Sequence, residues 1–135
     1  MKQIIMVGAM CLFLAGCRTK VEYFSLTNAL NDNKAKEALS SDIEFSFGGG
    51  EKQGAFITTS KRTTIARKGG VENACRWVLY FAIKQLQQQA RKEGNKKIVN
   101  IMGNWKHKPY DSKDNFQCAV GNMLAGVALK GFLEQ

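Results

Sequence analysis

Residues 73–93, NACRWVLYFAIKQLQQQARKE, carry the strongest periodicity in the chain and decide its fold. Apolar residues recur there at three- and four-residue steps, which places them on one face of an α-helix. The positions on this face are Cys75, Leu79, Ala82, Ile83, Leu86 and Ala90, and those on the opposite, polar face include Arg76, Lys84, Gln87, Gln88 and Arg91. Asn73 is a candidate N-cap and Gly94 a C-terminal stop. The pattern predicts a long amphipathic helix whose apolar face needs a second layer.

Strands are predicted on the C-terminal side of this helix. Residues 97–102 form a nearly continuous apolar run, which indicates a buried strand. A second strand is expected from residue 116 to about residue 129, and Gly121 and Gly126 suggest bends or a bulge within it.

A β-hairpin is predicted before the helix. Residues 42–47 alternate apolar and polar side chains, and residues 55–67 are rich in β-branched residues. The glycine-rich segment 48–54 between them is expected to be the turn. It lacks the Gly-Lys-Ser/Thr ending of a phosphate-binding loop and leads into a strand, so we expect no nucleotide site there.

The fold class predicted from these elements is α+β. We expect a short helix within residues 27–40, followed by an antiparallel sheet of about four strands packed on the long amphipathic helix in two layers. Residues 27–135 would form a single domain, of a size at which one hydrophobic core is adequate.

The first 17 residues, MKQIIMVGAMCLFLAGC, have the organisation of a signal peptide. Lys2 precedes an apolar run, and the ending Leu-Ala-Gly-Cys resembles the lipobox of bacterial lipoprotein signal peptides. That resemblance implies a signal peptide over residues 1–16, lipid attachment at Cys17, and a lipidated linker over residues 17–26. Arg18 and Lys20 end the run too early for a membrane-spanning helix. A short buried helix remains the alternative.

The other cysteines fit an exported protein. Cys11 would leave with the signal peptide, so Cys75 and Cys118 would remain in an oxidising compartment, where a disulfide is the expected outcome. Closing this loop of 43 residues would stabilise the fold by about 4 kcal/mol. Two buried free thiols are the alternative, and a zinc site would need further ligands at suitable spacing.

The positive net charge of the chain favours anionic partners. The chain has 20 basic and 11 acidic residues, a formal net charge of +9. A basic domain near a bilayer is attracted to anionic lipid headgroups, lipopolysaccharide phosphates or other envelope polyanions. We do not expect nucleic acid as a partner, because the signal peptide directs the chain out of the cytoplasm and the sequence contains no nucleic-acid-binding motif.

A basic and aromatic segment at residues 105–111 is the candidate contact site. The possible contact patch consists of Lys96, Lys97, Trp105, Lys106, His107, Lys108 and Tyr110. Such a patch could bind an anionic partner through its lysines and aromatic anchors. The alternative is an ordinary loop whose aromatic side chains cover the edge of the core. A metal-binding or hydrolytic set of His107, Asp111 and Asp114 is the rival function, although we expect no catalytic residue, metal or cofactor.

The helix at residues 73–94 and four later stretches carry a family resemblance. These stretches are KIVNI at residues 97–101, Tyr110, FQCAVG at residues 116–121 and MLAGVALKG at residues 123–131. Together they resemble a group of small bacterial envelope lipoproteins sometimes labelled excinuclease-like. They are more distantly similar to the outer-membrane stress-sensor lipoprotein of the Rcs phosphorelay and to YbjQ-type domains, for which metal binding is suggested.

The resemblance implies an interaction or stress-sensing module, anchored through Cys17, that contacts other envelope proteins. The Rcs sensor has two nonconsecutive disulfides, whereas Cys75 and Cys118 allow only one here. Arg18 differs from the aspartate that retains many lipoproteins in the inner membrane, which favours the periplasmic side of the outer membrane in a Gram-negative host. The sequence therefore predicts a non-enzymatic cell-envelope lipoprotein.

Overall fold

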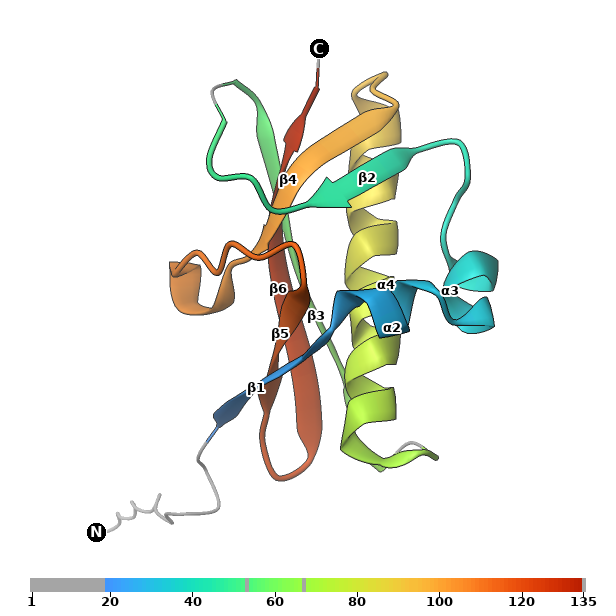
Figure 1. Ribbon diagram of the computed structural model, residues 1–135, viewed down its shortest axis with the longest axis vertical. Helices are drawn as coiled ribbons and strands as arrows, with labels where there is room; N and C mark the ends of the chain where they lie inside the picture. Colours follow the sequence, from blue (N-terminus) through green and yellow to red (C-terminus); the bar gives the residue numbers. More distant parts are fainter. Residues whose placement is uncertain (1–18, 53, 67, 135) are drawn as a thin grey trace, which may run out of the picture.

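The computed structural model describes residues 19–52, 54–66 and 68–134 as an α+β fold (Figure 1). Its strands are β1 (Lys20–Ser25), β2 (Glu44–Phe47), β3 (Phe56–Thr64), β4 (Lys97–Gly103), β5 (Asn115–Val120) and β6 (Leu124–Leu133). Its helices are α2 (Leu26–Leu30), α3 (Asn33–Ala38), α4 (Gly70–Lys92) and the short 3-10 helix η3 (Trp105–His107). The predicted combination of one long helix and a sheet is confirmed. None of the helices in the described ranges is long and apolar enough to cross a membrane.

Strand β6 organises the sheet. It pairs with β3 along nearly its whole length, and its other edge pairs with β5 at its beginning and with β4 towards its end. Strand β1 extends the sheet beyond β5 in antiparallel fashion, whereas β2 joins β4 in parallel. The described sheet is therefore mixed and has six strands, so the predicted antiparallel sheet of about four strands was wrong in both count and direction.

The predicted hairpin between residues 42–47 and 55–67 does not form, because β2 and β3 have different partners. The intervening glycines explain the difference. Gly48, Gly49 and Gly50 all have positive φ angles, of 82°, 115° and 85°. The Gly49 N–H donates to the Asp111 carboxylate, and the Asn100 side-chain amide donates to the Gly50 carbonyl. These contacts hold the segment against β4 and the loop before β5, so it does not act as a tight turn.

The strand predicted from residue 116 to about 129 is in fact a hairpin. Its turn is Asn122-Met123, closed by a hydrogen bond of 2.9 Å from the Gly121 N–H to the Leu124 carbonyl. The apolar character of Met123 and Leu124 obscures this turn in the sequence. The hairpin places β5 and β6 side by side, and the glycine at residue 121 marks a chain reversal, not a bend.

Residues 20–25, predicted as part of a lipidated linker, form strand β1 instead. The strand pairs with β5 from Lys20 opposite Val120 to Ser25 opposite Asn115. Phe24 packs on Phe116 with 5.8 Å between ring centroids, which explains why the segment joins the fold. Strand β1 therefore belongs to the folded domain, which was predicted to begin at residue 27. Residues 1–18, including Cys17, lie outside the described ranges.

The short helix predicted within residues 27–40 is two helices, α2 and α3. Asp32 separates them because it adopts an extended conformation and its carboxylate accepts a hydrogen bond of 2.9 Å from the Lys34 N–H, as an N-cap. Ser25 caps α2 in the same way through the Asn28 N–H.

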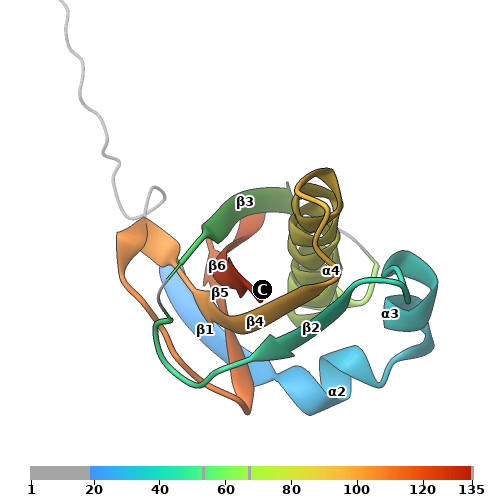
Figure 2. The ribbon, with the colours of Figure 1, turned by 90° about the horizontal axis from the view of Figure 1, so that it is seen from above.

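Helix α4 confirms the amphipathic pattern but begins at Gly70, three residues before the predicted N-cap. Gly69 occupies the N-cap position with φ 100°, and the Asn73 side chain donates instead to the Lys68 carbonyl at 2.6 Å. Gly94 has φ 71° and follows the C-terminus as predicted. Viewed from above in Figure 2, the sheet curves around α4, which packs on β3 and β6.

The main core lies between α4 and the concave face of the sheet. The buried side chains of α4 are Ala74, Cys75, Val78, Leu79, Tyr80, Ala82, Ile83, Leu86, Gln87 and Ala90. Three more buried apolar residues lie outside this core: Met102, Ala119 and Phe132. Alternation along the strands places them on the other face of the sheet, where the loops before β3 and β5 run. Both faces of the sheet therefore bury apolar side chains.

Candidate functional site

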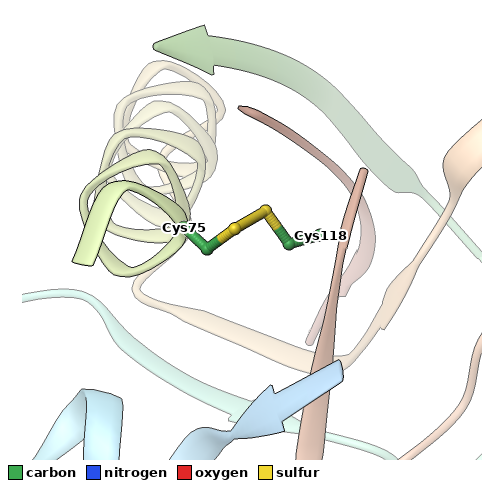
Figure 3. Close-up of a disulfide and its surroundings, with 2 residues drawn as sticks. All are labelled: Cys75 and Cys118. Atoms are coloured by element: carbon green, nitrogen blue, oxygen red, sulfur yellow. A yellow bond between two sulfur atoms is a disulfide. The ribbon is translucent and has the colours of Figure 1, made fainter. Parts of the chain in front are cut away.

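A disulfide joins Cys75, in the second turn of α4, to Cys118 in β5 (Figure 3). Their Cα atoms are 6.0 Å apart, and neither residue has exposed surface. The predicted pairing is confirmed, so the alternative of two free thiols does not describe this structure. The bond ties the long helix to the sheet near the beginning of the helix.

The basic and aromatic loop lies between β4 and β5, and residues 105–107 form η3. The Lys108 N–H donates to the Trp105 carbonyl at 3.1 Å, which closes the turn. Lys106 and His107 have positive φ angles of 55° and 61°, and the side chains of both are exposed, as is Lys108. Within the described residues, neither Lys106 nor Lys108 forms an ion pair.

Trp105 is half-buried and lines a surface groove of about 360 Å³ beside the β5–β6 turn. We call this the Trp105 groove, and its lining residues are Thr19, Arg62, Trp105, Ala119, Gly121, Asn122, Met123, Leu124, Ala125 and Gly126. Gly126 lies close to the indole, since a Cβ atom there would be 3.8 Å from Trp105 Cζ3. Met123 and Leu124 are 76% and 48% exposed. Sequence reasoning missed this groove, because Met123 and Leu124 were assigned to the interior of a strand.

Tyr110 lies on the sheet, away from the basic turn. Its ring centroid is 4.8 Å from that of Tyr23, and its backbone exchanges two hydrogen bonds of 2.9 Å with Gly103. A Cβ atom at Gly103 would come within 3.2 Å of Tyr110 Cβ and 2.9 Å of Gln117 Oε1, so this packing needs glycine. These contacts place Tyr110 against the sheet, next to Tyr23 and Gly103.

Lys96 and Lys97 lie at the other end of β4 from the basic loop. Lys97 pairs with Glu134, with 3.1 Å between Nζ and Oε1, and this hydrogen bond raises the pKa of Lys97. Six residues of strand separate Lys97 from Gly103, a distance of about 20 Å at the usual rise. The predicted contact patch is therefore not one surface, because only residues 105–108 stay together.

The rival set of His107, Asp111 and Asp114 is not gathered around one point. The Asp111 carboxylate accepts the Gly49 N–H at 3.0 Å, and the Asp114 carbonyl accepts the Leu26 N–H at 2.8 Å. The Asp111 side chain therefore joins two loops, and the Asp114 backbone joins the loop before β5 to the start of α2. Within the described ranges, no group of three His, Cys, Asp or Glu residues is placed to hold a metal ion.

A second hollow, of about 610 Å³, lies at the beginning of α4. It is lined by Lys34, Lys68, Gly69, Glu72, Asn73, Arg76 and Trp77. Arg76 contacts Glu72 at 3.0 Å and Asp32 at 3.4 Å, and Lys34 lies 5.8 Å from the centre of the Trp77 ring. Carboxylates thus balance part of the positive charge of this hollow, whereas the lining of the Trp105 groove includes Arg62 and no acidic residue.

No protein-family model, curated protein or solved structure shows significant similarity to this chain.

Proposed function

We propose that this chain is a bacterial cell-envelope lipoprotein, held at a membrane by lipid on Cys17, whose folded domain binds an envelope protein or polyanion without catalysing a reaction. The periplasmic face of the outer membrane is the proposed location in a Gram-negative host. The domain would act as an interaction or stress-sensing module.

The buried disulfide is the observation that carries this proposal. Disulfides persist in oxidising compartments and are rare in the cytoplasm of mesophilic bacteria. Cys75 and Cys118 are bonded inside the core, which supports export of the chain. Export is also what the lipobox-like ending at Cys17 implies.

The beginning of the fold supports close attachment to the membrane. Because β1 starts at Lys20, only Arg18 and Thr19 separate it from Cys17. The three Cα–Cα steps from Cys17 to Lys20 span at most about 11 Å when the chain is fully extended. A lipid on Cys17 would therefore hold the domain directly against the bilayer, with little freedom to move away from it.

The basic turn is the proposed contact for a partner. Lys106 and Lys108 are exposed and lie on a short turn. Exposed positive side chains favour an anionic surface on the partner.

Metabolic labelling with an alkyne fatty acid tests the anchor. The parent chain and Cys11→Ala are expected to incorporate the label, whereas Cys17→Ala should not, because it lacks the acceptor thiol. Cys11 is the matched control, since it is a cysteine within the proposed signal peptide. Equal labelling of Cys17→Ala, or no labelling of the parent, would overturn the proposal.

Crosslinking in intact cells tests the contact. Lys106→Glu/Lys108→Glu should lose a crosslinked partner that the parent captures. The double variant Lys36→Glu/Lys92→Glu has the same charge change at other exposed positions and should keep the partner. Equal loss in both variants would show that net charge, and not this turn, selects the partner.

A further inference from the structure

We infer that the Trp105 groove faces the bilayer and that the β5–β6 turn inserts among the lipid headgroups. This inference rests on the proposed lipid anchor at Cys17 and specifies how the domain lies on the membrane. Three features of the groove support it: its distance from the anchor, its exposed apolar tip and its charge.

The path of the chain brings the anchor to the groove. Thr19 lines the groove, and Cys17 precedes it by two residues, so the two Cα atoms are at most about 7 Å apart. Strand β1 pairs with β5 along all six of its residues, which fixes Thr19 beside the groove. Figure 1 shows the start of β1 and the β5–β6 turn at the same end of the molecule. A bilayer is therefore the one surface that lipidation would necessarily bring to this site.

The tip of the groove has the character of an interfacial anchor. Met123 and Leu124 expose 76% and 48% of their surface at the end of the hairpin. The turn is held in place, because the Ile65 N–H donates to the Met123 carbonyl at 3.0 Å in addition to the bond that closes the hairpin. A rigid apolar tip loses little conformational entropy on insertion. Trp105 lies beside it, and tryptophan is enriched at membrane interfaces.

The surrounding charge matches anionic headgroups. Arg62 lines the groove, and the groove has no acidic lining residue. A basic residue beside an apolar and aromatic tip favours a membrane that contains anionic lipid.

Depth-dependent quenching of Trp105 tests this orientation. The mature lipidated protein is reconstituted into vesicles of phosphatidylethanolamine and phosphatidylglycerol, with Trp77→Phe so that Trp105 is the only tryptophan. Lipids brominated at shallow acyl positions should quench Trp105 emission more strongly than lipids brominated near the bilayer centre. Met123→Asp/Leu124→Asp should lose most of this quenching while the protein stays on the vesicles.

Phe56→Asp is the matched control. Phe56 is an apolar residue that is 56% exposed, and it pairs with Phe132 at the opposite end of the β3–β6 ladder from Leu124. Eight residues of strand, or about 26 Å, separate the two ends. This variant should keep the quenching. Arg62→Glu is a second variant at an exposed position and should weaken quenching on vesicles with phosphatidylglycerol.

The outcomes separate this inference from the anchor itself. Two results with acylated protein that sediments with vesicles would overturn the orientation and leave the anchor intact. In the first, Trp105 is not quenched. In the second, Met123→Asp/Leu124→Asp leaves the quenching unchanged. Protein without acyl groups that fails to sediment would overturn both. A photo-crosslinker at position 123 that captures an envelope protein in cells, in place of lipid, would also overturn the inference.

Discussion

Cys75 and Cys118 form a covalent link between α4 and β5 inside the core, where both residues are fully buried. The two cysteines are 43 residues apart in the chain. The bond fixes the beginning of the long helix to β5, the strand that pairs with β1. The proposed membrane-proximal end of the domain is thus also its crosslinked end.

Removing this bond should strongly destabilise the domain. Cys75→Ala/Cys118→Ala should lower the free energy of unfolding by about 4 kcal/mol, because the unfolded chain regains the entropy of an open loop of 43 residues. Urea denaturation followed by circular dichroism measures the change. A reductant should shift the unfolding midpoint of the parent and leave that of the variant unchanged. An unaltered midpoint in the variant would contradict the structural role of the bond.

Gln87 should contribute stability although it is polar. Its side chain is fully buried, accepts the Ser40 N–H at 3.0 Å, and donates to the Ser40 and Ile43 carbonyls at 2.9 Å each. Gln87→Leu would leave these backbone groups unpaired and should cost about 2–4 kcal/mol in the free energy of unfolding. Gln88→Leu, at the exposed neighbouring position, should change it by less than about 0.5 kcal/mol. Similar values for the two variants in urea denaturation would refute this account.

Gly131 should not accept a methyl group. A Cβ atom there would lie 2.7 Å from Ile98 Cγ2 and 3.1 Å from Ile101 Cγ1, in the tightest part of the core. Gly131→Ala should therefore destabilise the domain by about 1–3 kcal/mol through overpacking. At Gly121 the nearest atom would be 3.7 Å away, so Gly121→Ala is the control and should be close to neutral. Thermal unfolding of both variants provides the comparison.

Because of Tyr80, the free energy of unfolding of the domain should fall as the pH rises in the alkaline range. Burial is the largest cause of its raised pKa, and its hydroxyl donates a hydrogen bond of 2.6 Å to the Ala29 carbonyl. The folded state holds the phenol proton more tightly than the unfolded state does. The contribution of this phenol to the free energy of unfolding is therefore complete below the unfolded pKa of about 10, and it is lost as pH rises through the folded pKa.

The Tyr80→Phe variant tests this linkage. It should be less stable than the parent by about 1 kcal/mol at neutral pH, because the hydrogen bond is lost. The difference should shrink above about pH 10, where the parent loses the contribution of the phenol. Urea denaturation over a pH series measures it, and a difference that stays constant through this range would count against a raised pKa.

The sequence predicted local features of the fold but did not predict which strands pair with one another. The spacing of Leu79, Ile83 and Leu86 predicts α4 because helical periodicity depends on neighbours three and four residues away. The pairing of β2 with β4 joins Phe45 to Ile98 across more than fifty residues, and no local pattern encodes it. The hairpin prediction failed for this reason.

Gln87 and Met123 show two other limits. Gln87 was assigned to the polar face of α4, but the chain between α3 and β2 supplies backbone partners that allow it to be buried. Met123 was assigned to a strand because it is apolar, yet it forms the tip of a turn. The disulfide was predictable because the lipobox resemblance assigns Cys11 and Cys17 to other roles and leaves one pair, Cys75 and Cys118. The Trp105 groove depends on how η3 meets the β5–β6 turn.

Intact-mass spectrometry of the protein purified from whole cells of its native host tests the central claim most directly. The account predicts a chain that begins at Cys17, carries the mass of attached acyl groups, and is two hydrogens lighter than its reduced form because Cys75 and Cys118 are bonded. An unmodified chain that still begins at Met1, with both cysteines reduced, would contradict it.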